Sequence, residues 1–284
     1  MFSDFFSVRE FLKQNHRLPN WFNTPLCFEY SHMHSNFQKM YSHRFGIWED
    51  DGEIVAAAYF EMELGEYIPC VKPGYEHLRT EMLSFAEREL SKKDHAGSRT
   101  LEIFSTDKQG LNDFYSANGY TIARSNAILI YPYDKGFNEC KLPEGFTLHT
   151  LEEENNIEKI DCCFWEGFGH GEWSKSEERE DGRLNAMMAP NFRADLATVV
   201  KAPNSDYACI AEMWVDDNSG YAYLEPLATR PKYRRMGLAT EALMESMKKT
   251  VPYGANYCYC GSIDFYRHLG CEQAGTLQMW KKTW

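Results

Sequence analysis

The chain has 284 residues, a length typical of two domains or of one large domain. Apolar residues make up 43% of it and aromatic residues 15%, which is enough for a packed core and argues against global disorder. The 42 acidic residues outnumber the 30 basic ones. The resulting net charge of −12 argues against a nucleic-acid or anionic-membrane binder, whose affinity comes from neutralising phosphates, and suits a small cationic partner.

Two features predict a cytoplasmic protein. No apolar run approaches the roughly 18 residues that span a bilayer, and Asp4, Arg9 and Lys13 fall where a secretory signal would be apolar. The nine cysteines follow no disulfide-framework spacing, so we expect free thiols in a reducing compartment.

The first half of the chain alternates apolar and polar residues in several short runs. We expect a hairpin from residues 44–50 and 54–64, a helix over 78–90, a strand over 98–104, a short helix over 111–120 that ends at Gly119, and a strand or hairpin over 122–133. Residues 132–145 hold two prolines and two glycines without an apolar period, which predicts a linker over 132–144.

The second half repeats this order of elements. We expect a strand over 146–151, helices over 151–168 and 176–189, hairpin strands over 197–202 and 207–215, a strand over 220–229, a helix over 238–250, a strand over 255–261, a short helix over 262–270 and a terminal hairpin over 271–282. Residues 113–120 (DFYSANGY) also echo residues 264–271 (DFYRHLGC). This repeat is too long for a solenoid unit and indicates a duplicated domain.

The strongest chemical signal is the turn between the strand over 220–229 and the helix over 238–250. Pro231 stops the strand, and Gly237 and Ala239 lack bulk at the start of the helix, where backbone N–H groups have no intrahelical partner. Such a helix start favours an anion such as a pyrophosphate. Four basic residues within this turn reverse the sign of an otherwise acidic chain: Arg230, Lys232, Arg234 and Arg235. The alternative is an ordinary solvated basic turn.

At this point the sequence resembles the GNAT superfamily of acyl-CoA-dependent N-acetyltransferases. The resemblance covers most of residues 145–284 and rests on Arg234-x-x-Gly237-x-Ala239 and on Phe265-Tyr266 with Gly270. It implies an α+β (α/β/α) fold with a mixed, mostly antiparallel sheet and helices on both faces. It also implies acetyl-CoA as co-substrate. The pyrophosphate would be held by Arg234, Arg235, Met236, Gly237, Leu238, Ala239 and Thr240, and the pantetheine arm by the backbone of Leu227, Ala228 and Thr229. Cys271 departs from the family, which usually has Phe there.

The first half resembles the same fold without its motif. Lys72-Pro73-Gly74-Tyr75 resembles the approach to the turn, but Glu76 stands where Arg would be and Arg79 where Gly would be. We therefore expect two tandem GNAT-like domains, a degenerate one over 1–131 and a catalytic one over 145–284, joined by the linker over 132–144. The degenerate copy would pack on the active one, and the acceptor would bind between them.

Two residues are candidates for proton transfer. Glu225 precedes Pro226, which disrupts regular strand pairing, and a carboxylate beside such a distortion can take a proton from an amine. The alternative is a strand-end residue bonded to a loop. Tyr266 matches the position at which the family frequently places a general acid for the departing thiolate, although it could also simply pack against the coenzyme. A strand amide near Ala228 could polarise the thioester carbonyl.

The acceptor side is less defined. Glu166, His170, Glu172 and Trp173 fall between the first two helices of the second half, where this fold covers the acceptor, and would suit a cationic amine; a solvated loop is the alternative. Cys258 and Cys260 share a strand face but lack the further ligands of a metal site, so we expect no metal.

The sequence thus predicts an acetyl-CoA-dependent N-acetyltransferase that moves an acetyl group directly to a primary amine of a small molecule or peptide. Two alternatives stay open. One is a non-catalytic acyl-CoA-binding regulatory module, in which Glu225 and Tyr266 are structural. The other is an aminoacyl-transferase that uses charged RNA, against which the net charge of −12 counts.

Overall fold

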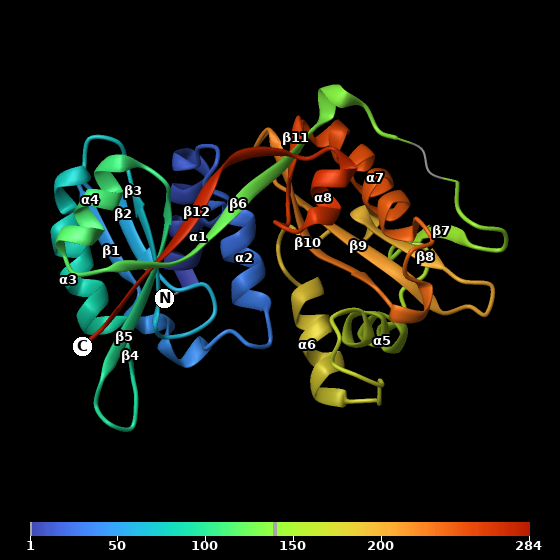
Figure 1. Ribbon diagram of the computed structural model, residues 1–284, viewed down its shortest axis with the longest axis horizontal. Coiled ribbons are helices and arrows are strands. Elements are labelled where there is room, and N and C mark those ends of the chain that lie inside the picture. Colours follow the sequence, from blue (N-terminus) through green and yellow to red (C-terminus); the bar gives the residue numbers. More distant parts are fainter. Residues whose placement is uncertain (1, 139–140) are drawn as a thin grey trace. The chain divides into compact units, whose positions relative to one another are not determined.

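The computed structural model describes residues 2–138 and 141–284, and the chain divides into two compact units (Figure 1). Unit 1 comprises the chain up to His32 together with Asn36–Ile128 and Gln273–Trp284. Unit 2 comprises Met33–Ser35 and Leu129–Glu272. The expected division at 131 and 145 differs from these units at the C-terminus, because the last strand of the chain pairs inside unit 1.

The sheet of unit 1 has the strand order β1-β2-β3-β5-β12. Its pairs are antiparallel, except that β3 runs parallel to β5. Its strands are β1 (Gly46–Asp50), β2 (Glu53–Tyr59), β3 (Glu66–Val71), β5 (Arg99–Thr106) and β12 (Glu272–Thr283), with the short β4 (Lys92–Lys93) paired to β5. The hairpin of β1 and β2 confirms the turn expected at residues 50–53.

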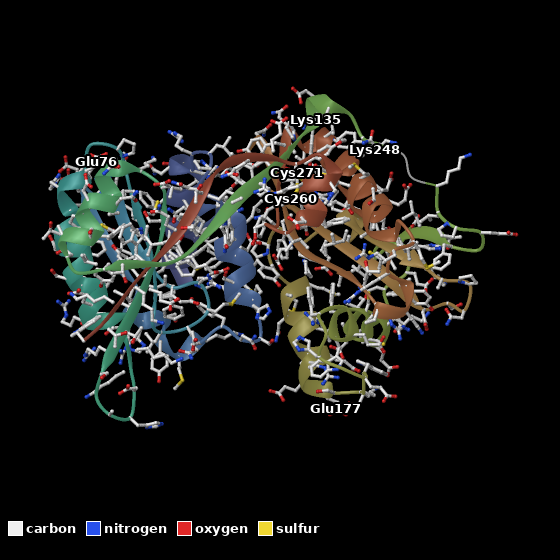
Figure 2. The ribbon with its side chains drawn as sticks, in the orientation of Figure 1. Glu76, Lys135, Glu177, Lys248, Cys260 and Cys271 are labelled. Carbon is white, nitrogen blue, oxygen red and sulfur yellow. The ribbon has the colours of Figure 1, made fainter. Side chains whose placement is uncertain are left out.

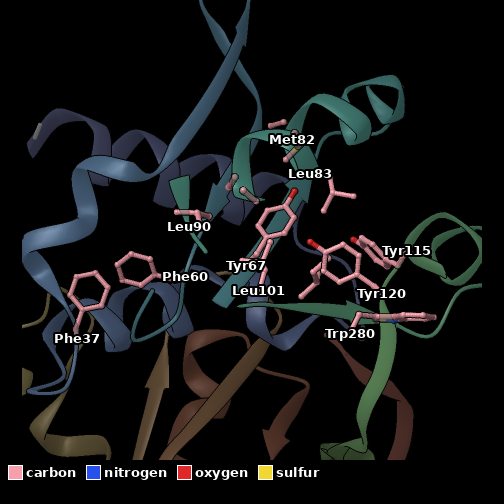
Figure 3. Packing of buried hydrophobic residues seen from close by; sticks show 14 residues of the cluster. Phe37, Phe60, Tyr67, Met82, Leu83, Leu90, Leu101, Tyr115, Tyr120 and Trp280 are labelled. Carbon is pink, nitrogen blue, oxygen red and sulfur yellow. The ribbon is translucent and has the colours of Figure 1, made fainter. Parts of the chain in front are cut away.

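The helices of unit 1 are α1 (Phe2–Asn15), α2 (Pro25–Met33), α3 (Arg79–Glu89) and α4 (Gln109–Ala117), with 3-10 turns η1 (Trp21–Asn23), η2 (Lys39–Arg44) and η3 (Glu76–Leu78). The core of this unit joins β2, β3, β5 and β12 to α3 and α4, and Figure 3 shows Tyr67, Met82, Leu101 and Trp280 within it. The predicted helices over 78–90 and 111–120 are confirmed as α3 and α4.

The strands of unit 2 follow the order β6-β11-β10-β9-β8-β7. They are β6 (Thr121–Pro132), β7 (Thr147–Thr150), β8 (Ala197–Lys201), β9 (Tyr207–Val215), β10 (Tyr221–Thr229) and β11 (Tyr257–Cys260). The chain enters unit 2 within β6, from Leu129 onward. Neighbours pair antiparallel, except that β10 runs parallel to β11.

The helices of unit 2 are α5 (Ile157–Gly167), α6 (Glu177–Met187), α7 (Leu238–Thr250) and α8 (Asp264–Leu269), with 3-10 turns η4 (Tyr133–Lys135), η5 (Ala194–Leu196), η6 (Pro231–Tyr233) and η7 (Val251–Tyr253). Ile160, Cys163 and Phe164 of α5 pack on Ile210 of β9 and Ala228 of β10. Helix α7 contacts β8, β9 and β10. This packing fixes the end of β10 and the start of α7, between which the predicted anion site lies.

The predicted terminal hairpin over 271–282 is wrong. These residues form one continuous strand, β12, whose segment Leu277–Thr283 pairs with Thr100–Thr106 of β5. Gly275, within this strand, allows close packing, because a Cβ there would lie 2.5 Å from Pro19 Cγ. Of the predicted linker over 132–144, residues 139 and 140 lie outside the described residues, and residues 133–135 form η4.

Candidate functional site

The parallel strands β10 and β11 pair over only part of the length of β10. Tyr221–Tyr223 pair with Tyr257–Tyr259, whereas the later part of β10, up to Thr229, pairs with β9 alone among the described strands. The register between β10 and β9 shifts between Leu224 and Leu227. The edge of β10 that faces β11 is therefore open from residue 224 onward, and its backbone can pair with a ligand instead.

The turn after β10 presents unoccupied backbone donors. Gly237 has φ +80° and caps the N-terminus of α7, a conformation that favours glycine. The first intrahelical bond of α7 runs from the Glu241 N–H to the Gly237 carbonyl. Among the described residues, no group accepts a hydrogen bond from the N–H groups of residues 235–240. No atom lies within 4 Å of where a Gly237 Cβ would be, so nothing blocks this helix start.

The four basic side chains of this turn do not act together, contrary to what the sequence suggested. Arg230 is buried and forms ion pairs with Glu166 (Nε–Oε2, 2.8 Å) and Asp206 (Nη1–Oδ2, 3.1 Å). Lys232 also pairs with Asp206, at 2.7 Å between Nζ and Oδ2. These two cations are therefore neutralised by carboxylates of unit 2.

The other two basic side chains remain available near the helix start. The Arg234 guanidinium donates to the carbonyls of Gly167 (2.8 Å) and Thr229 (3.2 Å), so it keeps its charge while it ties α5 to the end of β10. Arg235 is exposed and has φ +64°, a left-handed conformation that is uncommon for a residue with a Cβ. An anion at the start of α7 would therefore meet backbone amides and up to two arginines.

Pairing with β9 decides which amides of β10 face the open edge. The Arg230 N–H donates to the Ala208 carbonyl at 3.0 Å. Hydrogen-bonded pairs alternate along an antiparallel ladder, so Ala228 and Ile210, two residues back, also exchange bonds. The N–H groups of Leu227 and Thr229 consequently point away from β9. The amide donor expected near Ala228 is thus that of Leu227 or Thr229.

Glu225 lies on the bulged part of β10, beside a second carboxyl that the sequence did not single out. Its carbonyl accepts a 2.6 Å hydrogen bond from Trp214 Nε1, which fixes the backbone at this point. Glu212, on the neighbouring strand β9, is buried, and burial together with the nearby charge of Glu225 raises its pKa to about 8, against the opposing effect of Arg183. Glu212 is therefore mostly protonated at neutral pH.

Tyr266 lies on α8 and is almost fully buried. Its ring covers Gly261, where a Cβ would lie 2.6 Å from Tyr266 Cε2. Burial raises the pKa of its hydroxyl, and the nearby Cys260 and Glu225 add to the rise. The hydroxyl thus keeps its proton at neutral pH. Cys260 and Cys271, which Figure 2 labels next to each other, interact through their thiols beside this tyrosine.

The four residues proposed for the acceptor side differ in what they contact. Glu166 holds Arg230 through both carboxylate oxygens, and Trp173 Nε1 donates to Asp161 at 2.7 Å. His170 is exposed and packs its ring on Trp165, with 4.8 Å between the ring centroids. Glu172 is exposed, and its carbonyl accepts from Trp165 Nε1.

A buried carboxylate, Asp161, organises this region and was missed in the sequence. It lies on α5 with no exposed surface and accepts from Arg179 Nε of α6 at 3.1 Å as well as from Trp173. Arg179 also lies over the Trp165 ring, 4.1 Å from its centroid. The spacing of Arg179 and Arg183, four residues apart on one helix face, was the available signal for a buried anionic partner.

Neither metal ligation nor a membrane span is found in the described chain. Within residues 2–138 and 141–284, no three His, Cys, Asp or Glu side chains are grouped so that they could hold a metal ion. No helix in these ranges combines the length and the apolar character that a bilayer span requires.

Residues 158–271 match the model of the acetyltransferase (GNAT) family. This segment contains the open edge of β10, the start of α7 and Tyr266. Unit 2 therefore carries a GNAT acetyltransferase domain, and acetyl transfer is the activity of its family.

Solved structures share the fold over nearly the whole chain. A tandem GNAT protein from the clavulanic acid biosynthesis pathway matches with a TM-score of 0.62 and 12% identity, over 99% of this chain and 93% of the other. A GNAT-family acetyltransferase from Colwellia psychrerythraea matches with a TM-score of 0.61 and 12% identity, over 99% and 97%. A GCN5-related N-acetyltransferase from Sphaerobacter thermophilus matches with a TM-score of 0.62 and 16% identity, over 82% and 78%. No curated protein sequence matches the chain.

Proposed function

We propose that the chain is an acetyl-CoA-dependent N-acetyltransferase that transfers the acetyl group directly to a primary amine of a small molecule or peptide. The observation that carries this proposal is the row of unpartnered N–H groups at residues 235–240, beside the open edge of β10. These donors suit a pyrophosphate, and an open strand edge suits the amide groups of a pantetheine arm.

In this proposal the coenzyme is held by residues 227–229 and 234–240. The Leu227 carbonyl and the Thr229 N–H would pair with the pantetheine, since the backbone groups of both residues point away from β9. The amides around Gly237 would bind the pyrophosphate, and Arg235 would add a positive charge. The coenzyme supplies the thioester, and the Leu227 N–H is the donor we assign to its carbonyl oxygen, where negative charge develops during attack.

Glu225 is the proposed base. The amine must lose a proton as its nitrogen bonds to the acyl carbon, and a carboxylate near the bulge of β10 can accept that proton directly or through water. Glu212 supports this role, because burial, together with the nearby charge of Glu225, raises the pKa of Glu212 to about 8, so that Glu212 is not itself the carboxylate base at neutral pH. In the proposed reaction the C–S bond breaks, the C–N bond forms, and the sulfur receives a proton from Tyr266.

Tyr266 is the proposed acid. Burial raises the pKa of its hydroxyl, so the proton is present at the pH at which the thiolate leaves. On the acceptor side, His170 and Glu172 are the exposed candidates for contact with a cationic amine, whereas Glu166 and Trp173 would act by positioning α5 and the loop that follows it.

The test is release of free coenzyme A from acetyl-CoA in the presence of a panel of primary amines, followed by mass spectrometry of the product. The proposal expects an acetylated amine and a rate that Glu225→Gln lowers by about 10²-fold or more with little change in KM for acetyl-CoA. Binding of acetyl-CoA without turnover of any amine, or full activity of Glu225→Gln, would contradict the proposed chemistry or the proposed base, respectively.

A further inference from the structure

Unit 1 contains a cavity of about 210 Å³ that the proposed acetyl transfer does not use. It lies where β3 and β5 separate: these parallel strands pair only at Glu66–Tyr67 with Glu102–Ile103, and later residues of both strands line the cavity. The start of α3 at Arg79 and the start of α4 at Lys108 also line it. The parallel strands β3 and β5 of unit 1 thus separate as β10 and β11 do in unit 2, but different side chains surround the opening.

The charged groups around this cavity are mainly cations. Arg17, Arg79 and Lys108 line it, against the single carboxylate of Glu76. That carboxylate is already engaged, since it accepts from the Gly74 N–H at 2.9 Å. Among the described residues, the side chains of Arg79 and Lys108 form no ion pair within 4 Å and no hydrogen bond, and Arg79 acts on Glu76 only through its charge. These two cations are therefore available to an anionic ligand.

The rest of the wall is aromatic and amide in character. Five aromatic side chains line the cavity: Phe22, Tyr67, Phe104, Phe114 and Tyr115. Asn20 also lines it, and its Oδ1 atom is buried without a hydrogen-bond partner. Figure 3 shows the rings of Tyr67 and Tyr115 among the side chains of the unit 1 core. The lining is thus about as polar as it is apolar, and it combines aromatic rings with polar groups that could orient a small ligand.

We propose that this cavity binds a compact aromatic carboxylate, with its ring among the five aromatic side chains and its carboxylate on Arg79, assisted by Lys108. Arginine suits this role, because its planar guanidinium can bind a carboxylate through two parallel hydrogen bonds. The volume of about 210 Å³ is below the range of roughly 300–1,000 Å³ typical of sites for drug-sized ligands, which limits the ligand to a small molecule. This site is separate from the proposed coenzyme cradle and does not depend on it.

Binding of phenylacetate to the full-length protein, followed by calorimetry, tests the proposal. Phenylacetamide is the neutral match and phenethylamine the cationic one. We expect phenylacetate to bind one site per chain, at least about tenfold more tightly than phenylacetamide, with no detectable binding of phenethylamine. Arg79→Gln should weaken phenylacetate by about tenfold or more. Arg88→Gln, at the exposed C-terminal end of the same helix, should not change it.

A second variant separates loss of the site from loss of the fold. Leu111→Trp adds bulk on α4 at the cavity wall and should abolish phenylacetate binding while the circular dichroism spectrum and the affinity for acetyl-CoA stay unchanged. Equal affinities for phenylacetate and phenylacetamide, an unchanged affinity in Arg79→Gln, or no binding of phenylacetate at about 10 mM would overturn the proposal. None of these outcomes bears on acetyl transfer, which the release of free coenzyme A in the presence of amines measures separately.

Discussion

The turn after β10 in unit 2 and the turn after β3 in unit 1 connect corresponding strands and helices, yet they treat their backbone amides differently. At α7, Gly237 is left-handed and the N–H groups of residues 235–240 have no partner among the described residues. At α3, the chain first forms η3, and the Leu78 and Arg79 N–H groups donate to the carbonyls of Tyr75 and Glu76. In the turn after β3, these backbone N–H groups are thus bonded to carbonyls of the same turn.

Side chains reinforce this difference. In unit 1 the Glu76 carboxylate accepts the Gly74 N–H, and hydrogen bonds from its own backbone N–H and from Gly74 lower the pKa of this group. An anion is therefore already present where a phosphate would bind. Unit 1 therefore has an opening between its parallel strands β3 and β5, as unit 2 has between β10 and β11. At the start of α3, however, the Leu78 and Arg79 N–H groups are already bonded and are not available to an anion.

The largest expected effect comes from a substitution in the proposed coenzyme site of unit 2, residues 227–229 and 234–240. In Gly237→Glu, a negative side chain at a left-handed position should lower the affinity for acetyl-CoA by about 10²-fold or more, through charge repulsion and loss of the glycine conformation. Gly74→Glu is the matched control, because Gly74 also has positive φ and open space around it. Calorimetric titration should show affinity retained in the control. Equal losses in both variants would remove the distinction between the turns.

Removing the Tyr266 hydroxyl should have the next largest effect. We expect Tyr266→Phe to lower kcat by about 10²–10⁴-fold while KM for acetyl-CoA changes little, since the ring still covers Gly261. Steady-state kinetics with the amine found by product analysis measures this, and Tyr253→Phe on η7 is the control. An undiminished kcat would mean that the thiolate leaves without this proton.

The buried carboxyl of Glu212 on β9 should make the free energy of unfolding depend on pH. The pKa of Glu212 is about 8 in the folded chain, against an ordinary value of 4.5, so the folded state binds this proton more tightly. Stability then falls as the pH rises through this window. We expect Glu212→Gln to raise the free energy of unfolding by roughly 3–5 kcal/mol relative to wild type at about pH 9, and to match wild type at about pH 4, below the ordinary pKa of the carboxyl.

Urea unfolding at both pH values measures this difference, with the exposed Glu144→Gln as control. If Glu212→Gln is destabilising at about pH 9, the folded chain stabilises the ionised carboxyl through a partner, and the pKa of Glu212 is not raised on folding.

The smallest expected effect is a difference between Lys232 and Arg235 in their contribution to acetyl-CoA affinity. Lys232 is held by Asp206, so Lys232→Ala should change the affinity for acetyl-CoA by less than about twofold, whereas Arg235→Ala should weaken it severalfold. The two variants remove the same formal charge. A larger loss from Lys232→Ala would show that the ion pair with Asp206 opens when the coenzyme binds.

Much of this architecture could be predicted from the sequence, because periodicity and turn residues mark the elements locally. Short apolar runs predicted β8, β9 and β10, and Pro231 with Gly237 located the turn before α7. The pairing of the four cations could not be predicted, since Glu166 and Asp206 lie 64 and 24 residues from Arg230 along the chain. Glu212 was missed for the same reason: only packing of β9 brings it next to Glu225.

The C-terminal strand is a further feature that the sequence alone could not predict. The run over 271–282 was correctly predicted to be strand structure, but it was divided into a hairpin. Only the pairing with β5 and the close contact with Pro19 show that the segment is continuous. Long-range pairing decides such cases, and one sequence does not record it.

Isothermal titration calorimetry of the wild-type protein with acetyl-CoA distinguishes the two helix starts. We expect one binding site per chain, because among the described residues the N–H groups at the start of α7 have no partner and those at the start of α3 are bonded within the protein. Two equivalent sites, or none, would contradict this expectation.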